Sequence, residues 1–183
     1  MKIKVPLKKA NRLVNHGPVI LVSSFYKGRP NICTVAWNMP VDFDPPKVAC
    51  VIGDDNYSFE CIKNTGEFVI NIPGKSLLKK VIQCGSVSGK NIDKFKEFGL
   101  TPIAASKVKP PLIKECVAHL ECKLLRKDLA VEYNIFLAEI LCAWAEKSFF
   151  KNNRLLVEKS GAKTIHHLGA RFFAFPGNVI EVK

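Results

Sequence analysis

The sequence of 183 residues lacks any long apolar run, and none approaches the roughly 18 residues that a membrane-spanning helix needs. Its first nine residues are charged but have no apolar segment behind them, so they do not read as a signal peptide. We therefore expect a cytoplasmic protein with no membrane partner. The sequence also lacks internal repeats, low-complexity tracts and linkers, which predicts one domain over residues 1–183.

Several motifs of common catalytic and nucleotide-binding folds are also missing. Neither GxGxxG nor GxxxxGK followed by Ser or Thr occurs, which disfavours a Rossmann domain and a P-loop. A pentapeptide bounded by glycines occurs at 85–89, but Val87 stands where a serine hydrolase has its nucleophile. The adjacent His166 and His167 would point in different directions and have no carboxylate cluster nearby, so we predict no metal site.

The cysteines show no pairing pattern. There are seven of them, an odd number, and no CxxC spacing occurs, so neither a disulfide framework nor a structural zinc site is expected. Most lie in apolar surroundings, where cysteine packs as a small hydrophobic residue. Cys33 and Cys84 flank the site considered below, and their reactivity stays open.

Positive charge is in excess, with 28 Lys and Arg against 16 Asp and Glu and a formal net charge of +12. Nucleic-acid binding is one interpretation. The basic residues are dispersed, however, and no nucleic-acid module or basic stripe interleaved with aromatics is present. A solvated basic surface that attracts phosphorylated cofactors is the simpler account, and we expect no nucleic-acid partner.

Local patterns predict many strands with a few short helices among them. The predicted strands cover 18–24, 31–38, 47–53, 67–72, 115–125 and 131–146. The predicted helices cover 56–64, a segment from Ser76 and a short segment around 92–98, with loops at 42–46 and 84–89 and an irregular tail at 151–183. This order predicts a mainly β fold with short helices, closed as a β-barrel.

The segment from Asn31 to Asn38 is the most informative. It combines small, hydroxyl and amide side chains with one large aromatic, Trp37, where larger aliphatic residues would fill a core better. Such a strand suits a flat ligand lying along exposed main chain. Its N–H groups could bind a ligand only if that strand edge is unpaired. An ordinary sheet strand, a turn at Asn31 and a core position for Trp37 remain open alternatives.

Two later segments repeat this mixture of small, hydroxyl-bearing and basic residues, as a phosphate-bearing cofactor would require. One is Asn56 to Ser58, and the other runs from Cys84 to Phe95. The tripeptide 88–90 precedes a predicted helix, whose free N–H groups would attract a phosphate together with a hydroxyl and an ammonium. A capped helix start with solvated lysines is the alternative.

Taken together and in order, these segments resemble the flavin reductase-like family, and within it the flavoredoxin branch. The matching pieces are 31–37, 56–58, 66–73, 84–89 and 93–95, followed by 99–102, 111–113 and 120–122, and the similarity covers roughly residues 15–146. The resemblance implies an FMN-binding split β-barrel and a homodimer with flavin near the interface. The FMN would be either tightly bound or used as a substrate.

The resemblance also implies electron transfer from NADH or NADPH to flavin and onward to a small-molecule or protein acceptor. Along the isoalloxazine or ribityl chain it places Asn31, Thr34, Val35, Ala36, Trp37 and Asn38, and near the phosphate Ser58, Ser88, Gly89, Lys90 and Lys94. It identifies no catalytic acid or base.

One position departs from the family pattern. Many relatives have a histidine at the start of the last long strand, and here the matching residue is Tyr133. An FMN-binding electron carrier or sensor without nicotinamide-dependent turnover therefore stays an alternative. The aromatic run Phe172–Phe175 is expected to cover the flavin or the partner subunit.

Overall fold

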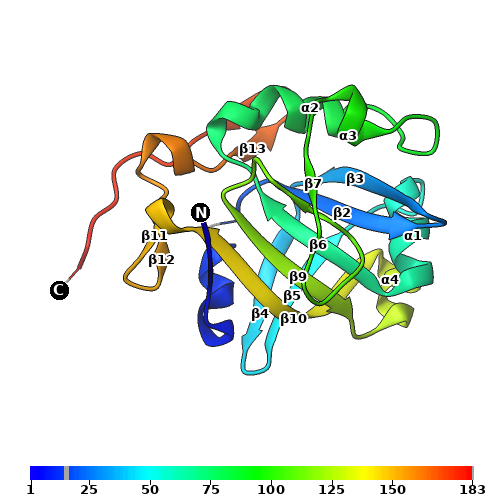
Figure 1. Cartoon of the computed structure of the whole chain (residues 1–183), viewed down its shortest axis with the longest axis horizontal. Coiled ribbons are helices and arrows are strands. Elements are labelled where there is room, and N and C mark those ends of the chain that lie inside the picture. Colours follow the sequence, from blue (N-terminus) through cyan, green and yellow to red (C-terminus); the bar gives the residue numbers. More distant parts are fainter. Residues whose placement is uncertain (15–16, 183) are drawn as a thin grey trace.

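The computed structural model describes residues 1–14 and 17–182. Eight of the described strands form one sheet, in which β3, β2, β6, β9, β10, β5 and β4 follow one another and β1 adds to β10 (Figure 1). These strands are β1 (Lys2–Lys4), β2 (Ile20–Tyr26), β3 (Arg29–Val35), β4 (Asn38–Phe43), β5 (Pro46–Val51), β6 (Glu67–Ile72), β9 (Ala118–Leu124) and β10 (Ile135–Glu146). The prediction of a mainly β fold with short helices is confirmed.

The other described elements are short and lie around this sheet. The helices are α1 (Tyr57–Thr65), α2 (Leu78–Ser86), α3 (Lys94–Glu97) and α4 (Lys127–Tyr133), with 3-10 turns η1 (Leu7–Leu13), η2 (Lys75–Leu77), η3 (Lys147–Phe149) and η4 (Ser160–Ala162). Three two-stranded ribbons pair β7 (Pro102–Ile103) with β8 (Leu112–Ile113), β11 (Phe150–Lys151) with β12 (Arg154–Leu155), and β13 (His166–Gly169) with β14 (Phe172–Ala174). None of the described helices is long and apolar enough to cross a membrane.

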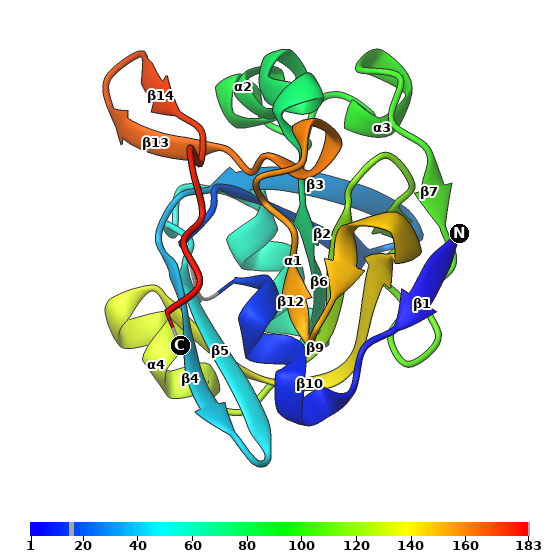
Figure 2. The same cartoon turned by 90° about the vertical axis from the view of Figure 1, so that its left-hand side faces the viewer.

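One extended segment closes the sheet on itself. β3 and β4 stand at opposite ends of the strand order but are separated in the chain only by Ala36 and Trp37. The first half of the segment pairs with β2 and the second half with β5, and the N–H of Val51 donates to the carbonyl of Trp37 at 3.0 Å. The sheet therefore curls into a barrel whose two ends meet at these two residues (Figure 2).

The barrel interior is filled by alternate residues of the strands. Phe68, Ile70 and Ile72 of β6 are fully buried in one core cluster together with residues of β9 and β10. Period-two alternation puts such residues on one face of each strand. Phe59 of α1 meets Phe136 of β10 edge to face, with ring centroids 5.4 Å apart, so α1 packs against the barrel core.

A second apolar cluster lies outside the barrel wall. It contains Leu21 and Ile32 from β2 and β3, Val81 and Cys84 from α2, and Phe95 from α3. This cluster fixes α2 and α3 beside β3, as Figure 1 shows at the top of the molecule. The strand that carries the candidate site is thus held from both sides, which limits how far its backbone can move.

The last long strand was predicted from residue 131, and this start is wrong. Residues 127–133 form helix α4, with Ala130 buried beneath it, and Asn134 ends the helix in a left-handed conformation with φ 62°. Asparagine tolerates this conformation better than most residues, so the chain can turn there into β10. Tyr133 therefore ends a helix and does not begin a strand.

Other boundaries also differ from prediction. β4 occupies part of the predicted 42–46 loop, α2 continues through Ser86 into the predicted 84–89 loop, and the short helix near 92–98 is reduced to α3. The tail predicted as irregular contains the ribbons β11–β12 and β13–β14. Short strands and helix ends depend on tertiary partners, which a local pattern does not include.

A buried carboxylate holds the connection between α3 and β9 against the sheet. Glu121, fully buried on β9, accepts hydrogen bonds from the N–H of Ser106, the N–H of Lys107 at 2.6 Å and the indole N–H of Trp144 at 2.7 Å. The hydroxyl of Ser106 adds a further bond at 3.1 Å. Because these donors converge on one carboxylate, a stretch with little regular structure has a fixed course.

Replacing this carboxylate should destabilise the fold. Glu121→Ala leaves the indole and main-chain donors without their acceptor, and we expect the free energy of unfolding to fall by about 2–4 kcal/mol. Urea denaturation measures this loss. Glu60→Ala, on the exposed face of α1, is the matched control and should change stability by less than about 0.5 kcal/mol. Equal stability of the two variants would contradict the role given to Glu121.

Candidate functional site

The outer edge of β3 is free of strand partners. Among the described strands β3 pairs with β2 alone, and its other edge faces α2 and α3. In an antiparallel strand the main-chain groups of alternate residues point to alternate edges. The carbonyl of Ile32 points to the free edge, where it accepts a side-chain hydrogen bond. The N–H and carbonyl of Thr34 therefore point the same way, which meets the condition set for ligand binding to this strand.

Lys94 lies beneath this edge as a buried cation. It is only 3% exposed, and its Nζ donates to the carbonyl of Ile32 at 2.7 Å and to that of Cys84 at 2.6 Å. Burial lowers the pKa of its ammonium, and neither of these partners is a carboxylate. Lys94 thus ties α3 to β3 and to the end of α2, and one of its three N–H groups remains for another acceptor.

Asn31 and Gly89 form the tightest contact of the site. Asn31 is buried in β3, which excludes the alternative of a turn residue, and its Nδ2 donates to the Oγ of Ser58 at 2.7 Å. Its Oδ1 has no hydrogen-bond partner among the described residues. A Cβ on Gly89 would stand 1.7 Å from that oxygen, so the loop can cross Asn31 only with glycine at this position.

The tripeptide 88–90 does not stand directly at a helix start, although the sequence had predicted that it would. The helix begins later, at Lys94, and the Oδ1 of Asp93 accepts hydrogen bonds from the N–H groups of Phe95 and Lys96. This is the capped helix start that was the open alternative. Ser88 and Lys90 are exposed in the loop before it, and Ser88 Oγ accepts from the N–H of Lys90 at 3.3 Å.

Ser88 instead lines a polar cleft between the beginning of α1 and the end of α2. The lining residues are Asp55, Asn56, Tyr57, Gly85, Ser86, Val87 and Ser88. Asn56 caps α1 by accepting from the N–H of Ser58 at 3.0 Å. A smaller hollow beside it adds Asp54, Glu60 and Lys90 to the lining. Ser86 and Ser88 bring hydroxyl groups to the polar cleft, and Asp55 brings a carboxylate.

An apolar cleft continues on the other side of Gly85. It is lined by Val19, Thr34, Ala36, Val81, Ile82, Gly85, His167, Ala170 and Phe173, from β3, α2 and the β13–β14 ribbon. Thr34 Oγ1 donates to the carbonyl of Val81 at 2.6 Å, and a Cβ on Gly85 would come within 3.3 Å of Thr34. Gly85 thus lines both clefts, and because it has no side chain the two clefts lie close together.

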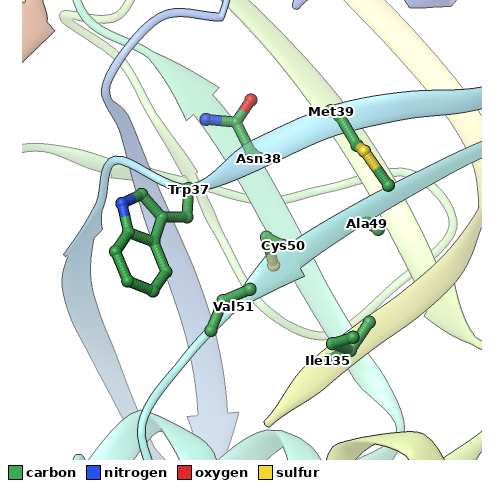
Figure 3. A pocket seen from close by; sticks show the side chains of 7 residues that line it. All are labelled: Trp37, Asn38, Met39, Ala49, Cys50, Val51 and Ile135. Atoms are coloured by element: carbon green, nitrogen blue, oxygen red, sulfur yellow. The ribbon is translucent and has the colours of Figure 1, made fainter. Parts of the chain in front are cut away.

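A third cleft lies on the outer face of β4, β5 and β10 (Figure 3). Trp37, Met39, Ala49, Val51 and Ile135 line it, together with Asn38 and Cys50. The side chain of Trp37 is 72% exposed, so the alternative of a core tryptophan is wrong. Asn38 donates through Nδ2 to the carbonyl of Pro18 at 2.7 Å, which fixes the start of β4.

The structure thus separates the predicted site residues into two groups. Asn31, Thr34, Ser58, Ser88, Gly89, Lys90 and Lys94 gather around the loop that follows α2, whereas Trp37 and Asn38 lie on the outer face. Ala36 lines the apolar cleft between them, and the side chain of Val35 faces the barrel core, which leaves only its main chain for a ligand.

Gly85, His167 and Tyr57 are among the cleft-lining residues that sequence reasoning missed. Gly85 and His167 had no assigned role, and Tyr57 was quoted only as part of a motif. Tyr133, by contrast, lines none of the described clefts; its hydroxyl donates to Glu132 at 2.8 Å on the surface. The aromatic run of the tail was a usable signal, because Phe173 faces the apolar cleft and lies 5.2 Å from His167.

The flavin reductase like domain is the family model that matches this chain, over residues 13–166. The chain belongs to the flavin reductase-like family. The YddH protein of Escherichia coli (strain K12) is 38% identical over 179 residues, which cover 96% of this chain and 95% of that protein.

Solved structures agree with this family membership. An FMN-binding domain of a flavin reductases-like enzyme from Shewanella baltica OS155 has a TM-score of 0.94 at 29% identity, covering 100% of this chain and 98% of that one. Flavoredoxin of Desulfovibrio vulgaris (Miyazaki F) has a TM-score of 0.81 at 26% identity, covering 91% and 90%. The predicted split barrel of flavin reductase-like proteins is thereby confirmed.

The two cysteines whose reactivity was open are poor nucleophiles in this fold. Cys33 and Cys84 are buried, and burial raises the pKa of each thiol to about 11. The nearby Lys94 ammonium opposes this rise but does not cancel it. At pH 8 a thiol with this pKa is about one part in a thousand thiolate, the reactive form.

A thiol reagent tests this directly. All seven cysteines lie within the described residues and are buried, so we expect slow reaction with a disulfide reagent at pH 8 and complete reaction in urea. Because the two pKa values are raised, the native rate should keep increasing above pH 8.5. Lys96→Cys adds one exposed thiol as a positive control. A native thiol as fast as that control would contradict the burial of these groups.

Proposed function

We propose that this chain binds FMN along the free edge of β3, in the polar and apolar clefts that meet at Gly85. One observation supports this proposal above the others: a polar, hydroxyl-lined cleft adjoins an apolar cleft. Both lie beside main-chain groups of Thr34 that have no strand partner among the described strands. FMN combines a phosphate, a polyhydroxyl chain and a flat ring, so it needs both kinds of surface at once.

Two details of the described residues fit such a ligand. The Oδ1 of Asn31 is a buried acceptor without a partner, and a donor group of a ligand or an ordered water would satisfy it. A Cβ on Gly89 would collide with the side chain of Asn31, and one on Gly85 would come within 3.3 Å of Thr34, so the main chain of both glycines lies close to side chains of β3. Main-chain N–H groups exposed in this way bind phosphate and carbonyl oxygens without a charged side chain.

The proposed roles of the residues follow from their positions. Ser58, Ser88, Gly89 and Lys90 would hold the phosphate end, with Lys94 as the buried cation beneath the loop, and the main chain from Thr34 to Trp37 would orient the ring. Bound FMN would supply hydride and single-electron transfer. The chain's own part is to orient the ring and to keep water from its apolar side, for which Phe173 and Ile82 are placed.

The activity we propose is that of a flavin-dependent oxidoreductase, with NADH or NADPH as donor and a small molecule or a protein as acceptor. Flavoredoxin and the flavin reductase-like enzyme among the structural neighbours support this class. The exposed position of Tyr133, away from the clefts, favours a second candidate: an FMN-binding electron carrier or sensor without nicotinamide turnover. Failure of both nicotinamides to bleach bound FMN within seconds would select that candidate.

The seven free cysteines support a reducing compartment, and we propose the cytoplasm. We further propose a homodimer formed through the outer face of β4. Met39, Val41 and Phe43 alternate with half-buried residues along this strand, and all three are exposed beside Trp37. A contiguous apolar face of this kind marks an association surface more often than a free one.

The flavin site can be tested by absorption. We expect purified protein mixed with FMN to retain flavin bands through gel filtration. Gly89→Ala should weaken FMN binding at least tenfold, because its methyl group collides with Asn31, and Trp37→Ala should weaken it less. Gly177→Ala, where a Cβ meets open space, is the matched control. Colourless protein under excess FMN would refute the proposal.

The proposed dimer can be tested by sedimentation. Phe43 is 64% exposed, so Phe43→Asp should leave the fold intact while placing a charge on the apolar face of β4. We expect the variant to sediment as a monomer at concentrations where the unmodified chain is a dimer. Ile103→Asp, an exposed apolar position on β7, which lies apart from β4 in Figure 2, is the control. An unchanged dimer in Phe43→Asp would remove this face from the interface.

A further inference from the structure

The segment that follows β14 leaves the body of the molecule. Residues 177–182 belong to no described helix or strand and are all exposed. Figure 1 shows this segment, which we call the arm, running out to the left until its end is clear of the other elements. No hydrogen bond from the arm to the rest of the described chain is present to hold it in this extended course.

The composition of the arm does not suit a free tail. Val179, Ile180 and Val182 are aliphatic and β-branched, and the last two are 83% and 89% exposed. Residues of this type favour an extended strand with one side covered. Solvated tails are instead rich in polar and charged residues, because apolar side chains gain nothing in water.

The chain's own surface offers the arm no apolar partner. The hollow between the arm and the body is lined on the body side by Arg12, Asn152, Arg154 and Glu158, all polar or charged. Arg154 and Glu158 are already paired with each other at 2.7 Å. The apolar side chains of the arm therefore face either charged groups or solvent in a single chain.

The apolar face of β4 is also exposed to solvent in a single chain. Trp37, Met39 and Phe43 are 72%, 59% and 64% exposed, so the described residues of the same chain leave these three side chains largely uncovered. Figure 2 looks onto the side from which the arm emerges and shows the arm in front of β4. The arm and β4 are therefore both seen from this side, although Figure 1 shows that the end of the arm stands away from β4 of the same chain.

We infer that the arm is exchanged between two copies of this chain and packs on the apolar face of β4 in the partner. This inference rests on the homodimer proposed above, and it specifies which segment of one copy packs against the other. An extended segment that crosses to a second copy buries its apolar side chains without needing a core of its own.

Removal of the arm is the first test. Deleting residues 177–183 should raise the dimer dissociation constant at least tenfold in sedimentation equilibrium, and Ile180→Asp should act in the same direction. Asn178→Asp changes the charge at an already polar, exposed position and should leave the constant unchanged. A deletion variant that dimerises as tightly as the full chain would overturn the inference.

Crosslinking between two preparations shows where the arm lies. Ile180→Cys in one preparation and Met39→Cys in a second, larger tagged preparation should give a mixed covalent dimer with a short bismaleimide. The seven native cysteines are buried and do not compete. Ile180→Cys with Glu60→Cys, exposed on α1, is the control pair. Absence of the mixed covalent dimer, or equal yield from the control pair, would overturn the exchange.

These measurements separate the arm from the flavin proposal. Mass and crosslink yield do not depend on flavin, so protein without flavin bands would refute FMN binding and leave the arm test intact. A chain that stays monomeric at all concentrations would overturn both the dimer and the exchange. Bound flavin with an arm-independent dimer would overturn the exchange alone.

Discussion

The structure around the candidate site depends on one buried ammonium group, that of Lys94, which forms no salt bridge with any of the described residues. The Nζ of Lys94 bonds the carbonyl of Ile32 on the free edge of β3 and the carbonyl of Cys84 near the end of α2. Main-chain carbonyls at a strand edge and a helix end would otherwise lie buried without donors. A single side chain satisfies both, and it thereby joins a strand and two helices that share no ladder hydrogen bonds.

This joint places the loop after α2 over Asn31 and opens the clefts on both sides of Gly85. The loop can follow this course only because Gly89 has no side chain in the way of Asn31, and Gly85 near the end of α2 lies close to Thr34. The edge of β3 that has no strand partner is therefore protected: helices cover one end of it, and the other end stays accessible. Such an edge can bind a ligand without inviting another chain to add to the sheet.

The local patterns predicted the element types well where the periodicity was strong. The core strands β2, β3, β5 and β6 and the helix capped by Asn56 were found with small boundary errors. Helix α4 was missed because Val131 and Tyr133, taken alone, favour strands. In the structure, burial of Ala130 and the left-handed conformation of Asn134 stabilise a helix there instead. Most residues of the proposed site were predicted from the family resemblance. The local sequence pattern by itself had left the structural alternative for each of them open.

The sequence by itself determined that this is a mainly β flavin reductase-like chain, because the order of short motifs and the glycine positions are local properties. The tertiary structure alone decided which chemical group each residue meets. It turned Lys94 inward to main-chain carbonyls, put Trp37 on the outer surface and moved Tyr133 to a helix end. Long-range packing fixes these directions, since a side chain's environment is set by segments distant in sequence.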